Sequence, residues 1–222
     1  MTYVVANLHG ALDKYQALLQ KIRFSKNDIL YVLGDTADYG EDAVALLTEL
    51  SMCENVYHVA GEHDFLALRM LSGFDKMLKS GSMPDADFAA EMTAWASDGG
   101  AATLEGFRAL DEDMREGLLD YLSECSLYEE VEAGGKDYVL VHAGIDCFDP
   151  EKPLDEYEPE NFFVTPSEEA YYEDRVVIIG HTPTKSGSIE KEGNIIRIDC
   201  GIKDGGKLGC LCLETGEEFY IE

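Results

Sequence analysis

Basic residues are scarce in this chain of 222 residues. Seventeen lysines and arginines stand against 45 aspartates and glutamates, so the formal net charge is −28. A surface of this sign repels nucleic-acid phosphates and anionic lipid headgroups, and neither is an expected partner. Two interpretations of the excess acid remain open: it keeps the chain soluble, or it raises the local concentration of divalent cations.

Long apolar runs and paired cysteines are also missing. No apolar run is long enough to span a bilayer. The strand-like start Met1–Val5 lacks a basic leader region, so we expect a cytoplasmic protein. The six cysteines are scattered without a C-x-x-C pair, which argues against a structural zinc site and predicts reduced thiols.

A strand–loop–helix pattern occurs three times in the first third of the chain. The predicted strands are Tyr3–Ala6, Ile29–Leu33 and Val56–Ala60. Apolar residues at helical spacing follow each strand, as in the predicted helix Glu41–Leu50 with acids in its first turn. Strands joined by helices in this way run parallel, so the pattern predicts an α/β fold.

The middle of the chain, from about Leu66 to Leu127, has helical spacing that is broken at Asp98-Gly99-Gly100. We interpret residues 66–127 as a helical insertion within a single domain that covers residues 1–222. It either caps a site or only packs beside the sheet. Further strands are predicted at Asp137–Val141, Val176–Ile179, Asn194–Ile198, Leu208–Leu213 and Glu218–Ile221, and the longest loop at Asp146–Ala170.

Four of the five histidines directly follow a predicted strand. They are His9, His63, His142 and His181, and the polar residues at similar places are Asn7, Asp35, Asp38 and Glu62. Loops at the carboxyl ends of parallel strands meet at one crevice of an open sheet, so these side chains are expected to converge. Imidazole and carboxylate ligands suit Zn, Fe and Mn, and two such ions can clamp a phosphoryl displacement.

The residues around the histidines form five motif blocks. They read Ala6-Asn7-Leu8-His9-Gly10, Gly34-Asp35-Thr36-Ala37-Asp38-Tyr39-Gly40, Gly61-Glu62-His63-Asp64, His142-Ala143-Gly144 and Gly180-His181-Thr182-Pro183. Their order resembles the calcineurin-like metallophosphoesterases, with G-D-x-H-G, G-D-x-x-D-R-G, G-N-H-E, H-A-G and G-H-T-P. The resemblance is nearest to the bacterial phosphoprotein phosphatase and diadenosine tetraphosphatase-like branch, and it extends to Trp95–Leu110 and Asp199–Glu217.

The resemblance implies a four-layer α/β/β/α sandwich and two divalent metal ions (Mn, Fe or Zn). The implied ligands are Asn7, His9 and the bridging Asp35 for the first ion, and Asp35, Glu62, His142 and His181 for the second. His63 is implied as the general acid, held by Asp38, and metal-activated water would attack phosphorus directly. The implied partner is a phosphorylated substrate, either a phosphoprotein or a small phosphoester.

The motifs depart from the family pattern at three positions. Asn7 replaces a metal-binding Asp and Glu62 replaces a metal-binding Asn, so the first ion is expected to bind more weakly. Tyr39 replaces a phosphate-binding Arg and is the candidate substrate-binding residue, with one neutral hydroxyl. A second family Arg would fall near Val164–Pro166, where none lies.

Two functions therefore remain open. The chain is a metal-dependent phosphoesterase, a serine/threonine-phosphatase-like hydrolase, or it is a catalytically weak or inactive relative that binds metal or a partner.

Overall fold

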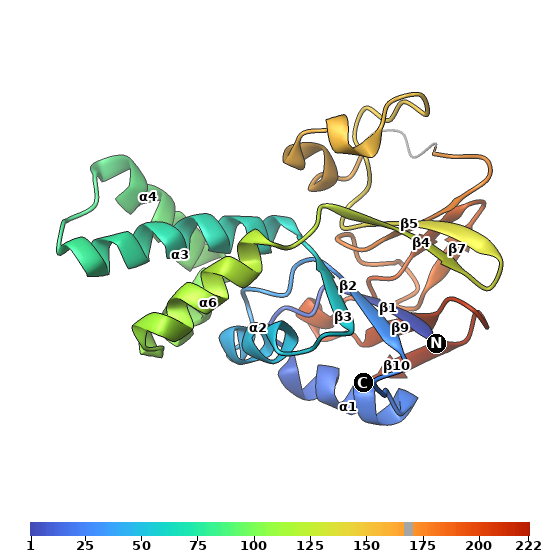
Figure 1. The fold of residues 1–222 in the computed structure, drawn as a ribbon, viewed down its shortest axis with the longest axis horizontal. Coiled ribbons are helices and arrows are strands. Elements are labelled where there is room, and N and C mark those ends of the chain that lie inside the picture. Colours follow the sequence, from blue (N-terminus) through green and yellow to red (C-terminus); the bar gives the residue numbers. More distant parts are fainter. Residues whose placement is uncertain (167–170) are drawn as a thin grey trace.

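Two sheets packed face to face form the centre of the computed structural model (Figure 1). The structure describes residues 1–166 and 171–222, so the last residues of the predicted loop Asp146–Ala170 lie outside the described part. Buried side chains from both sheets, among them Val4, Leu33, Leu140 and Ile178, fill the space between them. Each such apolar side chain contributes about 1.5–3 kcal/mol when it leaves water.

The first sheet has the strand order β10-β9-β1-β2-β3. Its strands are β1 (Thr2–Ala6), β2 (Ile29–Leu33), β3 (Val56–Val59), β9 (Leu208–Cys212) and β10 (Glu218–Ile221). β1, β2 and β3 run parallel, as the strand–loop–helix pattern predicts. The predicted hairpin of β9 and β10 is also confirmed, and β9 joins it to β1 in antiparallel register.

The second sheet has the order β4-β5-β6-β8-β7. Its strands are β4 (Tyr128–Ala133), β5 (Lys136–Val141), β6 (Val176–Ile179), β7 (Glu190–Glu192) and β8 (Ile195–Arg197). The three inner strands are parallel and the two edge strands antiparallel. The apolar pattern does not predict β4 and β7, because both are glutamate-rich edge strands without an apolar run.

Helices α1 (Leu12–Ile22) and α2 (Ala43–Ser51) cover the outer face of the first sheet. The predicted first turn of α2 is wrong: the helix begins at Ala43, and Glu41 and Asp42 precede it. Tyr39, just before, has a left-handed backbone (φ 63°), so the chain leaves the loop in a tight turn and cannot start the helix there.

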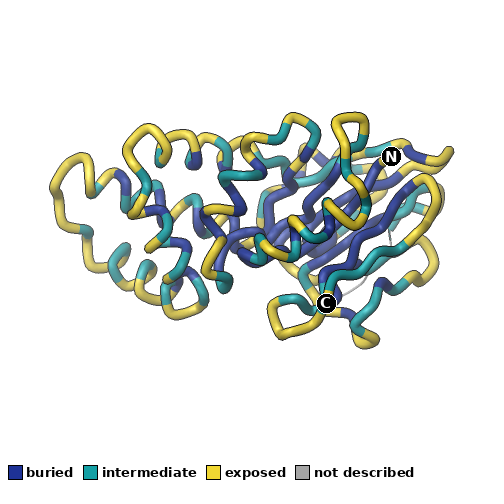
Figure 2. The backbone as a smooth tube through the Cα atoms, turned by 90° about the horizontal axis from the view of Figure 1, so that it is seen from below, coloured by how far each residue is buried: buried dark blue, intermediate teal, exposed yellow. Residues whose placement is uncertain are grey.

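In the sequence, the segment between β3 and β4 forms a helical arm. The arm extends away from the strands (Figure 1). Its elements are α3 (Glu62–Ser80), α4 (Ala86–Trp95), the π-helical turn η1 (Ala96–Gly100), α5 (Ala101–Ala109) and α6 (Glu112–Ser123). The predicted break is confirmed at Asp98 and Gly99, which have non-helical dihedral angles. The arm packs around an apolar cluster that it shares with α2, and exposed residues predominate at its tip (Figure 2).

The fourth layer covers the outer face of the second sheet. It consists of an irregular segment with two short 3₁₀ helices, η2 (Leu154–Glu156) and η3 (Pro159–Phe162). Leu154, Tyr157 and Phe162 pack there against the second sheet. The predicted four-layer sandwich is therefore confirmed. In the described residues, no helix is both long and apolar enough to cross a bilayer.

Candidate metal centre

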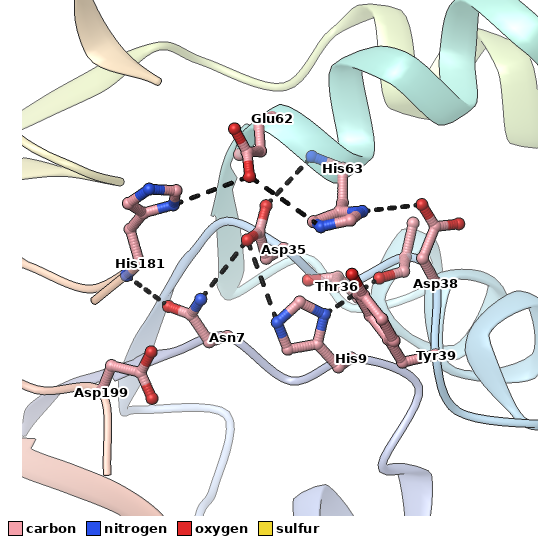
Figure 3. Close-up of polar contacts among 12 residues, drawn as sticks. Asn7, His9, Asp35, Thr36, Asp38, Tyr39, Glu62, His63, His181 and Asp199 are labelled. Carbon is pink, nitrogen blue, oxygen red and sulfur yellow. Dashed lines mark hydrogen bonds and ion pairs between the residues drawn. The ribbon is translucent and has the colours of Figure 1, made fainter. Parts of the chain in front are cut away.

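The predicted site residues gather where the carboxyl ends of five strands meet (Figure 3). The loops after β1, β2 and β3 supply one group, and the loops after β5 and β6 supply His142 and His181. The convergence expected at the edge of one open sheet is thus formed by two sheets. Facing carboxyl ends of the sandwich bring together residues that lie far apart in the chain.

Left-handed backbone is concentrated in these loops. The site residues with positive φ are Asn7 (54°), His9 (41°), Asp35 (49°), Asp38 (68°), Tyr39 (63°) and His181 (62°). This conformation costs a non-glycine residue about 1–2 kcal/mol, so the surrounding contacts must hold it in place. The strain fixes where the side chains point, and strained backbone of this kind clusters at functional sites.

Asp35 lies at the centre of the cluster and is buried. Its Oδ1 accepts a hydrogen bond from the His63 backbone N–H (3.1 Å) and lies 3.4 Å from His142 Nε2. Its Oδ2 faces Asn7 Nδ2 at 3.4 Å and His9 Nε2 at 3.9 Å. Burial alone would raise the pKa of Asp35, but His142 in particular, with His63 and His9, holds it well below its usual range.

His142 turns its Nε2 to the site. Its Nδ1 lies 3.1 Å from the Leu33 carbonyl oxygen, which can only accept, so Nδ1 carries a hydrogen and Nε2 is the ring nitrogen that faces Asp35. Nε2 lies 3.2 Å from His181 Nδ1. Burial lowers the pKa of His142, but the Asp35 carboxylate, with the Leu33 carbonyl and Asp64, more than offsets this and raises it. Burial and His142 lower the pKa of His181.

Glycine makes room for this arrangement at two places. A Cβ on Gly34 would lie 2.3 Å from His142 Nδ1, and a Cβ on Gly61 would lie 2.3 Å from Asp35 Oδ1. Neither distance is compatible with the observed side-chain positions. The motif glycines at these two positions therefore permit the close approach of the candidate ligands.

Two groups of described side chains can hold a metal ion. Asp35, His142 and His181 form the first, and Asp35, Glu62 and His63 the second; in each group the ligand atoms lie within 4.8 Å of one another. Glu62 is exposed at the first residue of α3, and its Oε1 lies 3.9 Å from both His63 Nε2 and His181 Nδ1. Asp35 belongs to both groups, and Glu62 connects them because it lies near His181 as well as His63.

The other side of Asp35 has fewer free ligand atoms. His9 Nδ1 lies 3.4 Å from the Ala37 carbonyl oxygen, which leaves Nε2 for the site, and burial lowers the pKa of His9 to about 4. Asn7 Oδ1 accepts the backbone N–H of His181 (2.8 Å). The Asn7 oxygen is thus already bonded, and its Nδ2, a donor, faces Asp35.

His63 is paired with Asp38, as the resemblance implies. His63 Nδ1 donates to Asp38 Oδ2 at 2.9 Å, so Nε2 points to the side of Glu62. Burial lowers the pKa of His63, but the hydrogen bond to Asp38 and the charges of Asp35, Asp38 and Glu62 together outweigh burial, and the pKa is raised. The pair is buried on the Asp38 side, which favours one fixed ring orientation.

The helical arm holds Asp38 in place. Trp95 Nε1 donates to Asp38 Oδ2 (2.8 Å), and Thr103 Oγ1 donates to Asp38 Oδ1 (2.8 Å). The Asp38 backbone N–H donates back to Thr103 Oγ1 (3.0 Å). The arm therefore holds a site residue in place. This role differs from both predicted alternatives, a cap over the site and plain packing beside the sheet. Trp95 and Thr103 lie outside the five motif blocks, although the resemblance over Trp95–Leu110 includes them.

Tyr39 forms a wall of the site. Its hydroxyl donates to Asp98 Oδ1 (3.1 Å), so the group predicted to contact substrate is already bonded to the arm. The ring meets the rings of His9 and His63 edge-on, at centroid distances of 5.2 and 5.0 Å. Lys203 lies outside the five motif blocks. Its Nζ is 3.8 Å from the Tyr39 ring centroid.

A second buried His–Asp pair lies beneath the loop of Asp35. Asp64 Oδ1 accepts the backbone N–H groups of Thr36 and Ala37, both at 2.9 Å. Asp64 Oδ2 lies 3.1 Å from His58 Nε2. This pair holds the backbone of the Asp35 loop. His58, the one histidine inside a strand, is thereby connected to the site.

Comparisons with known proteins agree with this geometry. Residues 2–204 match the family model for calcineurin-like phosphoesterases. The symmetrical bis(5'-nucleosyl)-tetraphosphatase of Acidovorax sp. (strain JS42) is 30% identical over 145 residues, which cover 64% of this chain and 43% of that protein. The protein of the same name from Glaesserella parasuis serovar 5 (strain SH0165) is 37% identical over 92 residues, covering 40% and 34%. The chain thus spans less than half the length of these relatives.

Solved structures share the fold. A protein assigned as a diadenosine tetraphosphatase has a TM-score of 0.69 at 18% identity, covering 99% of this chain and 92% of that chain. A serine/threonine phosphatase from Saccharomyces cerevisiae has a TM-score of 0.58 at 13% identity, covering 100% and 79%. The sequence match, the motif order and the shared fold agree, and the chain belongs to the calcineurin-like phosphoesterase family.

Proposed function

We propose that this protein is a metal-dependent phosphoesterase that hydrolyses a small phosphate ester. The observation that carries the proposal is the meeting of His142 Nε2 and His181 Nδ1, 3.2 Å apart, beside Asp35 Oδ1. The names of the curated relatives, tetraphosphatases of dinucleosides, favour a small phosphoester over a phosphoprotein as the substrate.

The donor set fits a divalent cation. Two ring nitrogens at this distance repel each other unless a proton or a cation lies between them, and Asp35 supplies a neighbouring negative charge. Imidazole with carboxylate suits Mn, Fe or Zn. We assign the stronger position to Asp35, Glu62, His142 and His181, and a weaker second position to Asp35, His9 and Asn7.

A divalent ion bound here would act as a Lewis acid and supply hydroxide from bound water at neutral pH. The protein's own residues do the rest. His63 Nε2 donates a proton to the leaving oxygen, while Asp38 holds Nδ1–H and stabilises the charged ring. Trp95 and Thr103 keep Asp38 from turning away, since they bond both of its oxygens. His58 and Asp64 hold the loop backbone that carries Asp35.

One observation favours the second candidate, a weakly active or inactive relative that binds metal or a partner. Asn7 turns a nitrogen toward Asp35, where an oxygen ligand would be needed for a strong second ion. A phosphoesterase that depends on two tightly bound ions would be impaired by this contact.

The test is turnover of an aryl phosphate and of diadenosine tetraphosphate by purified protein with Mn²⁺, Fe²⁺ or Zn²⁺. We expect metal-dependent hydrolysis that falls about 100-fold or more in His63→Ala, because the general acid is lost. Elemental analysis serves as the control and should show unchanged metal content in that variant. Wild-type turnover no higher than that of His63→Ala, with every metal and both substrates, would refute the enzyme and favour the inactive relative.

A further inference from the structure

We propose that Lys203 binds the substrate's phosphate group, and that the hollow it lines accepts esters with a single phosphate. This inference rests on the proposed function and specifies its substrate class. Lys203 lies in the short helix η4 (Ile202–Asp204), just before β9, and belongs to none of the five motif blocks.

The position of the Lys203 ammonium is defined by Tyr39. Nζ lies 3.8 Å from the Tyr39 ring centroid, and the other side chains in contact with that ring include the site histidines His9 and His63. The ring itself is anchored, because its hydroxyl is bonded to Asp98. The Tyr39 ring therefore contacts the Lys203 ammonium as well as the candidate metal ligand His9 and the candidate general acid His63.

A phosphate ester needs a cation in this place. The carboxylates labelled in Figure 3 are those of Asp35, Asp38, Glu62 and Asp199, and all of them repel a phosphate. Tyr39 carries no positive charge, and its hydroxyl already donates to Asp98. A lysine ammonium is a compact charge with three donors, which suits a single phosphate group.

Lys203, His9 and Tyr39 line one open hollow of about 310 Å³. Among the described residues that line it, Lys203 is the one with a fixed positive charge. Lys203 thus places a cation in the same hollow as the candidate metal ligand His9.

The same hollow limits how much negative charge a substrate can carry. Its exposed acidic lining consists of Asp13, Glu41 and Asp42. One lysine against three carboxylates accommodates one phosphate, while additional phosphates would face like charges. A monophosphate ester of an uncharged or cationic alcohol fits this distribution better than a dinucleoside tetraphosphate does.

The first experiment compares Lys203→Met with Lys207→Met in metal-loaded protein. Lys207 is a matched control, because its Nζ also lies over a tyrosine ring, Tyr220, at 4.3 Å, but outside the hollow. For Lys203→Met we expect KM for an aryl phosphate, and the dissociation constant of inorganic phosphate measured by calorimetry, to rise about tenfold. The metal content should stay unchanged in both variants.

These outcomes separate the inference from the proposed function. If wild-type protein turns over substrate and Lys203→Met behaves like Lys207→Met in KM and phosphate affinity, Lys203 is not the phosphate-binding residue. If no protein turns over substrate, the proposed function fails, and the phosphate titration still decides the role of Lys203. A tenfold loss of phosphate affinity in Lys203→Met alone supports it.

The second experiment tests the substrate class. We expect wild-type kcat/KM to be at least about tenfold higher for an aryl monophosphate than for diadenosine tetraphosphate. The double change Glu41→Gln with Asp42→Asn should narrow this ratio by speeding the tetraphosphate reaction. Equal or faster cleavage of the tetraphosphate by wild-type protein would overturn the single-phosphate assignment.

Discussion

The two oxygens of Asp35 have different neighbours. Oδ1 lies beside Nε2 of His142, with His181 next to it, and this side has several candidate ligand atoms. Oδ2 lies beside the amide nitrogen of Asn7 and the more distant Nε2 of His9. The Asp35 carboxylate thus lies between a candidate metal position with several ligand atoms and one with few.

The difference arises from two residues that change the charge of each side. Asn7 leaves the Oδ2 side without a second carboxylate, and its amide joins Asp35 to the His181 backbone instead. Glu62 adds a carboxylate at the mouth of the Oδ1 side. The two proposed ion positions are therefore expected to differ in affinity, and this asymmetry can be measured.

The largest effect is expected from removing ligands on the two sides separately. His142→Ala should weaken binding of the tighter ion by about 100-fold or more and abolish turnover, because it removes a buried ligand between Asp35 and His181. His9→Ala should lower the metal content by at most the weaker ion. Titration calorimetry with Mn²⁺ and elemental analysis would show both effects, and equal losses in the two variants would contradict the asymmetry.

A smaller, opposite effect is expected from Asn7→Asp. The change restores a carboxylate on the Oδ2 side, so the affinity of the weaker ion should rise about tenfold at neutral pH. Two ions per chain should then be retained after dialysis. If the stoichiometry and both affinities match those of wild-type protein, Asn7 does not limit the second position.

The smallest effect is expected from Thr103→Val, which changes neither side of Asp35. Loss of the hydrogen bond to the buried Asp38 should cost about 1–2 kcal/mol of unfolding free energy and lower kcat several-fold, with metal content unchanged. Thr93→Val is the matched control, because Thr93 Oγ1 donates only to its own helix at Ala89. A loss of metal in Thr103→Val would mean that the arm supports the ions rather than His63.

Much of the fold could be predicted because apolar runs mark buried parallel strands. β1, β2, β5 and β6 lie within about one residue of their predicted bounds. The edge strand β4 escaped the prediction because three of its six residues are glutamates. Its turn at Gly134 and Gly135, both with positive φ, was the available signal, since such a pair is typical of a two-residue hairpin.

The candidate ligands were predictable because each follows a strand directly. Their supporting contacts were not, because they join distant parts of the chain: Trp95 and Thr103 reach Asp38 across 57 and 65 residues. The orientation of the Asn7 amide could not be predicted either, since it depends on the backbone N–H of His181. Lys203 lies outside the five motif blocks, although the resemblance over Asp199–Glu217 includes it, and its place over Tyr39 shows its relation to the site.

The bond between Asn7 and His181 joins residues 174 positions apart and connects the loops of the two sheets. Neither loop alone contains all the candidate ligands, so the proposed ion position forms only after the sheets have docked. An ion that binds this docked state and not the unfolded chain adds about 2.7 kcal/mol of stability at 100 times its dissociation constant. Metal supply would then govern how long the folded chain survives thermal unfolding or proteolysis, and not only its rate of reaction.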